Sequence, residues 1–241
     1  MATYTGIKGF KVQSLASDPS GPDGNIWYNT TSPSALKYAI VGSGAWASGA
    51  NMNTARQAMG QAGISSSSAQ VASGYPGPSE TGRDLTEQYN GTSWTEVADQ
   101  NTKLFKRAGS GILTAAMLAG GFNPSGAGNK VTSTEKWNGS TWTEVNDLQN
   151  ATQNSSLIGT TTANLSVGGE SPGVSADVET YDGTSWSEGA NLNTARRNSG
   201  GAGTSTAALA IGGTTPPSLD QVESYNGTSW SEGNDLNTGR A

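Results

Sequence analysis

Cysteine and histidine are both absent from this sequence of 241 residues. Without them the chain has no disulfide framework and no thiolate or imidazole metal site, and it lacks the side chains of Ser-His-Asp or Cys-His catalysis. Charge is also scarce, because only 13% of the residues are charged and the formal net charge is −6. Phosphate binding needs clustered Lys and Arg, so this composition argues against a nucleic-acid partner.

Long apolar segments are missing as well. The longest apolar stretches, such as residues 115–119, are far below the roughly 20 residues that a membrane-spanning helix needs. The first 15 residues lack the continuous apolar region and the cleavage site of a secretory signal peptide. We therefore expect neither membrane insertion nor export by the usual route.

What the chain does contain is an internal repeat that its tryptophans mark. Successive repeat tryptophans are separated by 48, 48, 44 and 44 residues, and a regular period of this length is typical of repeat architectures. These tryptophans are Trp46, Trp94, Trp142, Trp186 and Trp230. The last three are predicted to be buried between neighbouring units.

Four of the five tryptophans close the phrase YNGTSW or a variant of it. The phrase indicates two strands joined by a tight turn, because Asn-Gly and Asp-Gly tolerate the positive φ that such turns require. A two-residue and a four-residue turn are both compatible with it, and both place the first aromatic residue on the same face as the Trp. These aromatic residues are Tyr89, Trp137, Tyr181 and Tyr225.

Each unit also contains a short apolar run that ends in glycine, as expected of a buried strand. In the last three units the run ends in a glycine pair that begins 26 residues after the preceding Trp. A Gly- and Ser-rich stretch before the run supplies a fourth strand, and four short strands in 44–48 residues correspond to one blade of a β-propeller. The glycine pairs are Gly120 and Gly121, Gly168 and Gly169, and Gly212 and Gly213.

The order of Arg, small residues, apolar-Gly-Gly, Tyr and Trp resembles the kelch repeat. In that pattern the Arg opens the first strand of a blade, the glycine pair ends the second, and Tyr and Trp lie on the third and fourth. The fourth unit matches at Arg196, Gly212, Gly213, Tyr225 and Trp230. The first unit matches at Arg56, Gly74, Tyr89 and Trp94, whereas Leu104 and Thr152 replace the Arg in the second and third.

The repeat spacing predicts an all-β chain with four complete blades between about residues 53 and 237. The repeat region as a whole is expected over residues 53–241 and ends in the middle of a repeat. Residues 36–41 and 46–52 are expected to form the last two strands of an earlier, partial blade. The sequence stops where the first strand of another blade would begin. We expect the natural chain to be longer, and the alternatives are an open ring or one that a neighbour completes.

The N-terminal region is a different unit. Its segment GNIWYNTTSPSALKY resembles hairpins common near the start of tail and fibre proteins of tailed bacteriophages. We expect residues 1–23 to form an arm and linker, and residues 24–52 to form a β-hairpin leading into the partial blade. The matching positions are Gly24, Ile26, Trp27, Tyr28, Asn29, Thr30, Leu36, Lys37 and Tyr38.

The two resemblances together imply a non-enzymatic virion protein, a fibre or decoration on the tail or capsid surface with a role in host attachment. Its implied partners are other virion proteins through the N-terminal arm, a host surface glycan or protein, and further copies of the same chain. The implied location is the virion, assembled in the host cytoplasm. No catalytic, cofactor-binding or metal-binding residue is predicted.

Two other functions stay open at this point: a kelch-type protein-interaction module and, with less support, a carbohydrate-active enzyme. The recurring Glu96, Glu144, Glu188 and Glu232 could form a cation-binding ring, but we expect solvated charges or partners of Arg56 and Arg196. The loops between the second and third strands hold most of the length variation, and recognition usually lies in such loops. They are expected at residues 75–84, 122–130, 170–175 and 214–219.

Overall fold

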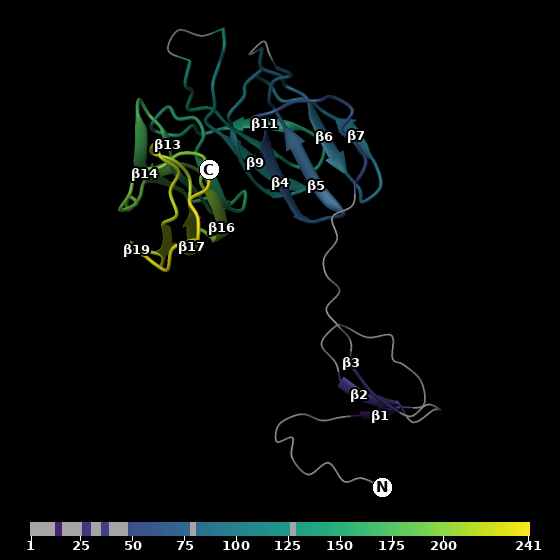
Figure 1. The fold of residues 1–241 in the computed structure, drawn as a ribbon. Helices are drawn as coiled ribbons and strands as arrows, with labels where there is room; N and C mark the ends of the chain where they lie inside the picture. The colour runs from purple at the N-terminus through teal and green to yellow at the C-terminus, as the bar shows by residue number, and fades with distance from the viewer. Residues whose placement is uncertain (1–12, 16–25, 30–34, 39–47, 78–80, 126–128) are drawn as a thin grey trace. The chain divides into compact units, whose positions relative to one another are not determined.

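The computed structural model describes residues 13–15, 26–29, 35–38, 48–77, 81–125 and 129–241 (Figure 1). The chain divides into two compact units, residues 1–48 and 49–241. The described residues form strands, turns and bends. None of them belongs to a helix that could cross a membrane.

The first unit contains a three-stranded sheet. Its strands are β1 (Gln13–Leu15), β2 (Ile26–Asn29) and β3 (Ala35–Tyr38), in the order β1-β2-β3. The hairpin pairs β2 with β3 in antiparallel fashion, and β1 runs parallel to β2. Strand β1 lies in the region expected to be an arm, and this part of the arm therefore pairs within the chain itself. Trp46 lies outside the described residues.

The second unit contains four sheets, here called blades 1 to 4, each with four antiparallel strands in chain order. Blade 1 comprises β4 (Gly60–Ser65), β5 (Ser68–Ala72), β6 (Thr86–Tyr89) and β7 (Trp94–Val97). Blade 2 comprises β8 (Ala108–Ile112), β9 (Ala115–Ala119), β10 (Thr134–Trp137) and β11 (Trp142–Val145). Blade 3 comprises β12 (Ser156–Gly159), β13 (Asn164–Glu170), β14 (Val174–Tyr181) and β15 (Trp186–Glu188). Blade 4 comprises β16 (Gly200–Thr204), β17 (Ala207–Ile211), β18 (Val222–Tyr225) and β19 (Trp230–Glu232).

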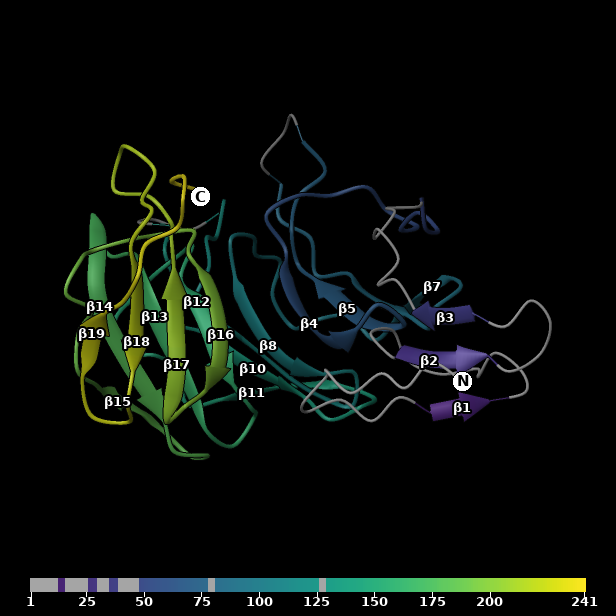
Figure 2. The same ribbon diagram turned by 60° about the horizontal axis from the view of Figure 1, so that its bottom comes forward.

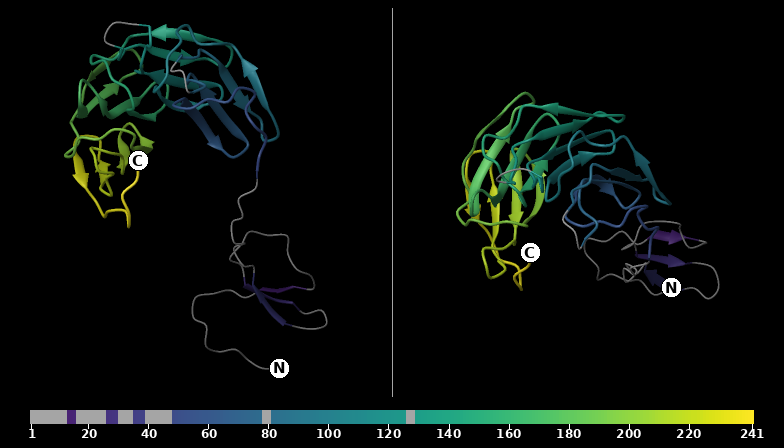
Figure 3. Two further views of the ribbon diagram at one scale, coloured as in Figure 1. Left: turned by 45° about the horizontal axis from the view of Figure 1, so that its top comes forward. Right: turned by 90° about the horizontal axis from the view of Figure 1, so that it is seen from above.

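The four blades follow one another as a β-propeller, with blade 1 and blade 4 at the two ends of an open arc (Figure 3). The first strands β4, β8, β12 and β16 lie next to one another along the inner side. Blade 4 ends the series with β16, β17, β18 and β19 side by side (Figure 2). The predicted all-β fold with four complete blades is confirmed.

The prediction of a strand over residues 46–52 is wrong for the described residues 48–52, which form no strand. Strand β3, which was expected to pair with it in a partial blade, pairs with β2. The segment after residue 48 is fixed by contacts with blade 1: the Trp94 indole donates to the carbonyl of Ala50 at 3.1 Å, and Glu87 accepts the backbone N–H of Asn53 at 2.7 Å. It is therefore a linker into blade 1.

The repeat tryptophans of blades 2 to 4 are buried between blades, as the sequence predicts, with 6%, 4% and 6% of Trp142, Trp186 and Trp230 exposed. Each packs against the blade before it. The indole N–H groups of Trp142 and Trp186 donate to the hydroxyls of Thr86 and Thr134. The indole of Trp230 has no recorded acceptor among the described residues.

The turn register that the sequence leaves open is the four-residue one. Tyr225 lies opposite Trp230, and their ring centroids are 5.0 Å apart. The side-chain oxygen of Asn226 accepts the backbone N–H groups of Thr228 and Ser229, both at 2.9 Å. This Asx turn closes the hairpin and sets the aromatic pair. Equivalent pairs occur in the other blades at Tyr89 and Trp94, Trp137 and Trp142, and Tyr181 and Trp186.

The glycine pairs mark the place where a blade meets the linker that leads to the next one. Gly168 has φ +61, and a Cβ atom there would lie 2.4 Å from the carbonyl oxygen of Arg196. The N–H of Gly169 donates to that same carbonyl at 2.8 Å. Only glycine permits both the backbone conformation and this close approach. Gly120 and Gly212 have the same conformation and the same close approach to a linker carbonyl.

Candidate ligand-binding face

Each blade carries a buried glutamate on its third strand, two residues before the aromatic residue that opens the turn. This carboxylate holds the segment that enters the blade, here called the entry linker (residues 49–59, 98–107, 146–155 and 189–199). In blade 4, Glu223 accepts the backbone N–H groups of Asn193 at 2.7 Å and Thr194 at 3.1 Å. The four glutamates, which are at most 4% exposed, are Glu87, Glu135, Glu179 and Glu223.

In three blades an arginine pairs with this glutamate. Arg56 and Arg196, the two arginines of the repeat pattern, bind Glu87 and Glu223 at 2.6 Å, and their side chains are fully buried. They lie in the entry linkers, four residues before the first strand, and do not open that strand as expected. The recurring glutamates after the repeat Trp, expected to be solvated charges or partners of these arginines, are exposed, and the arginines pair with other carboxylates.

Blade 2 keeps the ion pair although Leu104 occupies the repeat position of the arginine. Arg107, three residues later, supplies the guanidinium and binds Glu135 at 2.7 Å. Burial lowers the pKa of Arg107, while the charge and hydrogen bond of Glu135 act in the opposite direction. Blade 3 has Thr152 at the repeat position, and Glu179 forms no recorded ion pair within the described part of the chain. The buried ion pairs hold the entry linkers in place. All the entry linkers therefore lie at one end of the blades.

The loops between second and third strands lie at the same end as the entry linkers, because backbone bridges join the two. Arg197 pairs with Thr214 and Phe105 with Phe122 in this way. We call this end of the blades the loop face. The loop expected over 170–175 is shorter than predicted, because β13 extends to Glu170 and β14 begins at Val174.

On the side of blades 1 and 2, an aromatic cluster lies at the loop face, with Phe105 buried at its centre. The ring of Phe105 lies 4.7 Å from that of Tyr75 and 5.0 Å from that of Phe122, between centroids. The Lys106 ammonium lies 5.1 Å and 5.2 Å from the Phe105 and Phe122 ring centroids. These cation–π contacts hold a positive charge at this surface.

On the side of blades 3 and 4, an ion-pair network joins three blades. Glu170 of blade 3 binds Arg197 at 2.6 Å and Lys130 of the blade 2 loop at 3.5 Å. Burial raises the pKa of Glu170, but the hydrogen bonds from Arg197 and Gln153 and the charge of Lys130 outweigh it, so the net shift is downward. Two of the loops that the sequence singles out for their variable length, those of blades 2 and 3, are therefore tied to each other and to the entry linker of blade 4.

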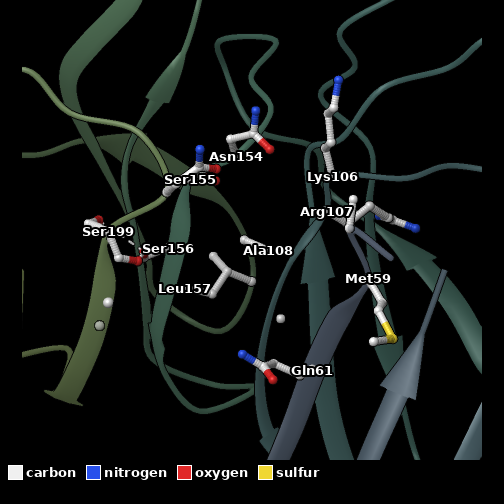
Figure 4. Close-up of a pocket in the computed structure, with 15 residues that line it drawn as sticks. Met59, Gln61, Lys106, Arg107, Ala108, Asn154, Ser155, Ser156, Leu157 and Ser199 are labelled. Atoms are coloured by element: carbon white, nitrogen blue, oxygen red, sulfur yellow. Dashed lines mark hydrogen bonds between the residues drawn. The ribbon is translucent and has the colours of Figure 1, made fainter. Parts of the chain in front are cut away.

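A cavity of about 280 Å³ opens beside these groups (Figure 4). Figure 4 shows Gln61, Lys106 and Asn154 around it, and the other polar side chains that line it include Ser155 and Ser199. No carboxylate belongs to its described lining. The site can therefore donate and accept hydrogen bonds through amides and hydroxyls, but it offers no pair of carboxylates for acid-base chemistry.

Backbone hydrogen bonds between successive entry linkers connect four residues that line this cavity. The N–H of Lys106 donates to the carbonyl of Ala58, that of Asn154 to Lys106, and that of Asn198 to Asn154, at 2.7, 3.0 and 2.9 Å. All four residues have φ between 54° and 57°. Each stands 12 residues after a repeat Trp, a regularity visible in the sequence that could have indicated this site.

The repeat residues chosen from the sequence lie elsewhere. The aromatic repeat positions of blades 2 to 4 pack between blades, whereas Tyr89 and Trp94 of blade 1 are half-buried, and the glycine pairs contact the linkers. The hairpin residues belong to the first unit: Ile26, Trp27 and Tyr28 on β2, and Leu36 and Tyr38 on β3.

No protein-family model matches the chain, and no curated protein matches it in sequence. What the structure establishes is the architecture: an all-β chain in which residues 49–241 form a four-bladed β-propeller.

Proposed function

We propose that this chain is a non-enzymatic virion structural protein of a tailed bacteriophage, a fibre or decoration on the tail or capsid surface. Residues 1–48 hold it to other virion proteins, and copies of the chain associate through the same region. The loop face of the propeller binds a glycan or protein on the host surface. The virion assignment rests on the resemblance of the hairpin at residues 26–38 to hairpins of phage tail and fibre proteins.

We also propose that the blades are kelch-like repeats. The position of the buried Arg196 at the entrance of blade 4, the glycine pair after β17, and the facing Tyr225 and Trp230 support this relationship. Blade 2 departs from the simple repeat pattern, because its buried arginine is Arg107, three residues after the repeat position.

The observation that carries the binding role is the polar cavity on the loop face. Amides and hydroxyls such as those of Gln61, Asn154 and Ser199 line it, and these groups match the hydroxyl-rich surface of a sugar. The ion-pair network around Glu170 and the aromatic cluster around Phe105 fix the surrounding loops. A rigid site loses little entropy on binding, which favours recognition of a weakly bound surface ligand.

Deletion of residues 1–23 tests the attachment role. We expect the variant to be absent from purified particles while its propeller keeps the melting temperature of the full chain. Normal incorporation of the deletion variant would mean that the blades themselves contact the virion.

The double variant Asn154→Gly, Asn198→Gly tests the binding role. It removes two amides but retains the positive φ of both residues, since glycine adopts that conformation freely. We expect normal incorporation and reduced adsorption to host cells. The exposed Thr184 lies in a turn of blade 3 between its third and fourth strands, and Thr184→Ala serves as the control that leaves adsorption unchanged. Adsorption that the double variant does not reduce would exclude the cavity as the site.

A further inference from the structure

Three of the four blades place a guanidinium group in the same polar position. In blade 4, Arg196 donates to the carbonyls of Gly212 at 3.0 Å and Gln221 at 2.9 Å, and to the carboxylate of Glu223 at 2.6 Å. In blade 2, Arg107 donates to the corresponding carbonyls and carboxylate, those of Gly120, Ser133 and Glu135. Each position thus combines one buried negative charge with backbone oxygens, and each receives one positive charge.

Blade 3 has the same oxygen groups without the arginine. Gly168, Asp177 and Glu179 stand at the register positions of Gly212, Gln221 and Glu223. Glu179 is 4% exposed and accepts the backbone N–H groups of Gln149 at 2.8 Å and Asn150 at 2.9 Å. No Lys or Arg side chain is recorded as a partner of Glu179 within the described residues.

A small cavity of about 10 Å³ lies at this position in blade 3. Such a volume holds about one particle of the size of a water molecule. The cavity is lined by Glu179, Gly168, Asp177 and Asn150, and by residues whose side chains carry hydroxyls. These hydroxyl residues are Thr152, Ser166, Ser171 and Ser175.

Oxygen atoms of this kind are ligands for hard cations, while a single buried carboxylate calls for a single positive charge. We propose that this cavity binds one monovalent alkali cation of the size of Na⁺, which supplies in blade 3 the charge that a guanidinium supplies in blades 1, 2 and 4. The cation is held by the Glu179 carboxylate together with the backbone carbonyls of Gly168 and Asp177. It joins β13 and β14 to the entry linker, as Arg196 does in blade 4.

The electrostatics of the site agree with this assignment. Burial raises the pKa of Glu179, and the negative charges of Glu188 and Asp177 raise it further, although the two backbone N–H groups lower it. The ionised carboxylate therefore lacks a compensating charge among the protein groups around it. A bound cation would provide that charge and would lower the pKa again.

Thermal unfolding of the full chain at constant ionic strength tests the proposal, with NaCl exchanged stepwise for N-methylglucamine chloride. We expect Na⁺ to raise the melting temperature in a saturable manner. At ten times the dissociation constant, the ratio of folded to unfolded protein should rise about elevenfold. An equal melting temperature in both salts would overturn the proposal and indicate that the cavity holds only water.

Two variants locate the effect. Thr152→Arg installs the arginine of blades 1 and 4, and Glu179→Gln removes the carboxylate, so both should lose the response to Na⁺. Glu144→Gln changes an exposed carboxylate of blade 2 and should keep it. The readout is the rise in melting temperature on addition of Na⁺, and not the melting temperature of each variant itself. An undiminished rise in Glu179→Gln would overturn the assignment.

A crystal structure determined in NaCl gives a readout that needs no variant. A Na⁺ ion is expected beside the Glu179 carboxylate, with oxygen ligands closer than the hydrogen-bonding partners of a water molecule would be. Density with the hydrogen-bond distances of a water molecule at that position would contradict the site even where Thr152→Arg fails to fold.

Discussion

Arg196→Met is the substitution that tests the buried ion pairs most sharply. The Arg196 side chain is fully buried and donates four hydrogen bonds, one of them to Glu223 at 2.6 Å and the others to carbonyls of Thr194, Gly212 and Gln221. Methionine has a similar length and fills much of the same space, so the change removes the charge and the donors more than the volume. Glu223 then remains buried without its cation.

The expected loss follows from that unpaired charge. Removing one partner of a buried ion pair costs about 3–5 kcal/mol. For a domain of this size each kcal/mol lowers the melting temperature by about 2–4 °C, so the predicted decrease is about 6–20 °C. Urea unfolding followed by tryptophan fluorescence measures the free energy, and calorimetry measures the melting temperature.

Lys103→Met is the matched control, because it removes an exposed positive charge that lies 4.0 Å from Asp84. Exposed pairs contribute about 0–1 kcal/mol, so its melting temperature should stay close to that of the parent chain. If Arg196→Met lowers stability no more than Lys103→Met, the buried pair does not hold the entry linker, and the reasoning fails.

Trp186→Ala should cost about 3–5 kcal/mol, because Trp186 is 4% exposed and packs between blades 2 and 3, and calorimetry that finds little change would place it at the surface. Val178→Thr should offer the Trp230 indole the hydroxyl acceptor that the other two buried indoles have. The Val178→Thr variant should therefore be about 1–3 kcal/mol more stable than the control Val167→Thr, whose hydroxyl would be buried in the same core without such a donor. Equal urea midpoints of the two variants would refute this. Because the folded state raises the pKa of Glu179 above 4.5, this carboxylate binds more protons in the folded than in the unfolded protein. In Na⁺-free buffer the stability of the parent chain relative to Glu179→Gln should therefore fall as the pH rises above 4.5. A pH-independent difference between the two proteins would contradict this.

The propeller could be predicted from the sequence because its strongest signals are local. The Trp period, the glycine pairs and the Asn-Gly turns each specify a strand end or a turn within a few residues. They locate four blades without any knowledge of distant contacts. The turn length was left open, since both registers place Tyr225 and Trp230 on one face, and the Asn226 side chain decides it in the folded chain.

The buried glutamates could not be recognised in the same way. Charged residues are rarely buried, and nothing near Glu87 in the sequence shows that it is. Its partners come from the entry linker, where Arg56 is 31 residues away. The glutamates that recur visibly in the sequence, Glu96 and its equivalents, follow the repeat Trp and are exposed. Arg107 was missed for a related reason, because it reaches Glu135 from a position outside the repeat pattern.

The loop-face cavity was missed because it is built from backbone turns. Its polar residues, such as Asn154 and Asn198, are unremarkable in a chain rich in Ser and Asn. Only the assembly of successive entry linkers brings them together, through hydrogen bonds between blades. The sequence predicted functional loops at this end, and the cavity lies beside them.

Antibody labelling of intact particles tests the central claim most directly, with an antibody raised against the loop-face residues of blades 2 and 3 and binding observed by electron microscopy. The proposed function predicts labels on the outside of intact particles of the phage that encodes the chain, at the tail or the capsid surface. Labelling only after particles are disrupted, or none at all on particles shown to contain the chain, would contradict an outward-facing propeller that contacts the host.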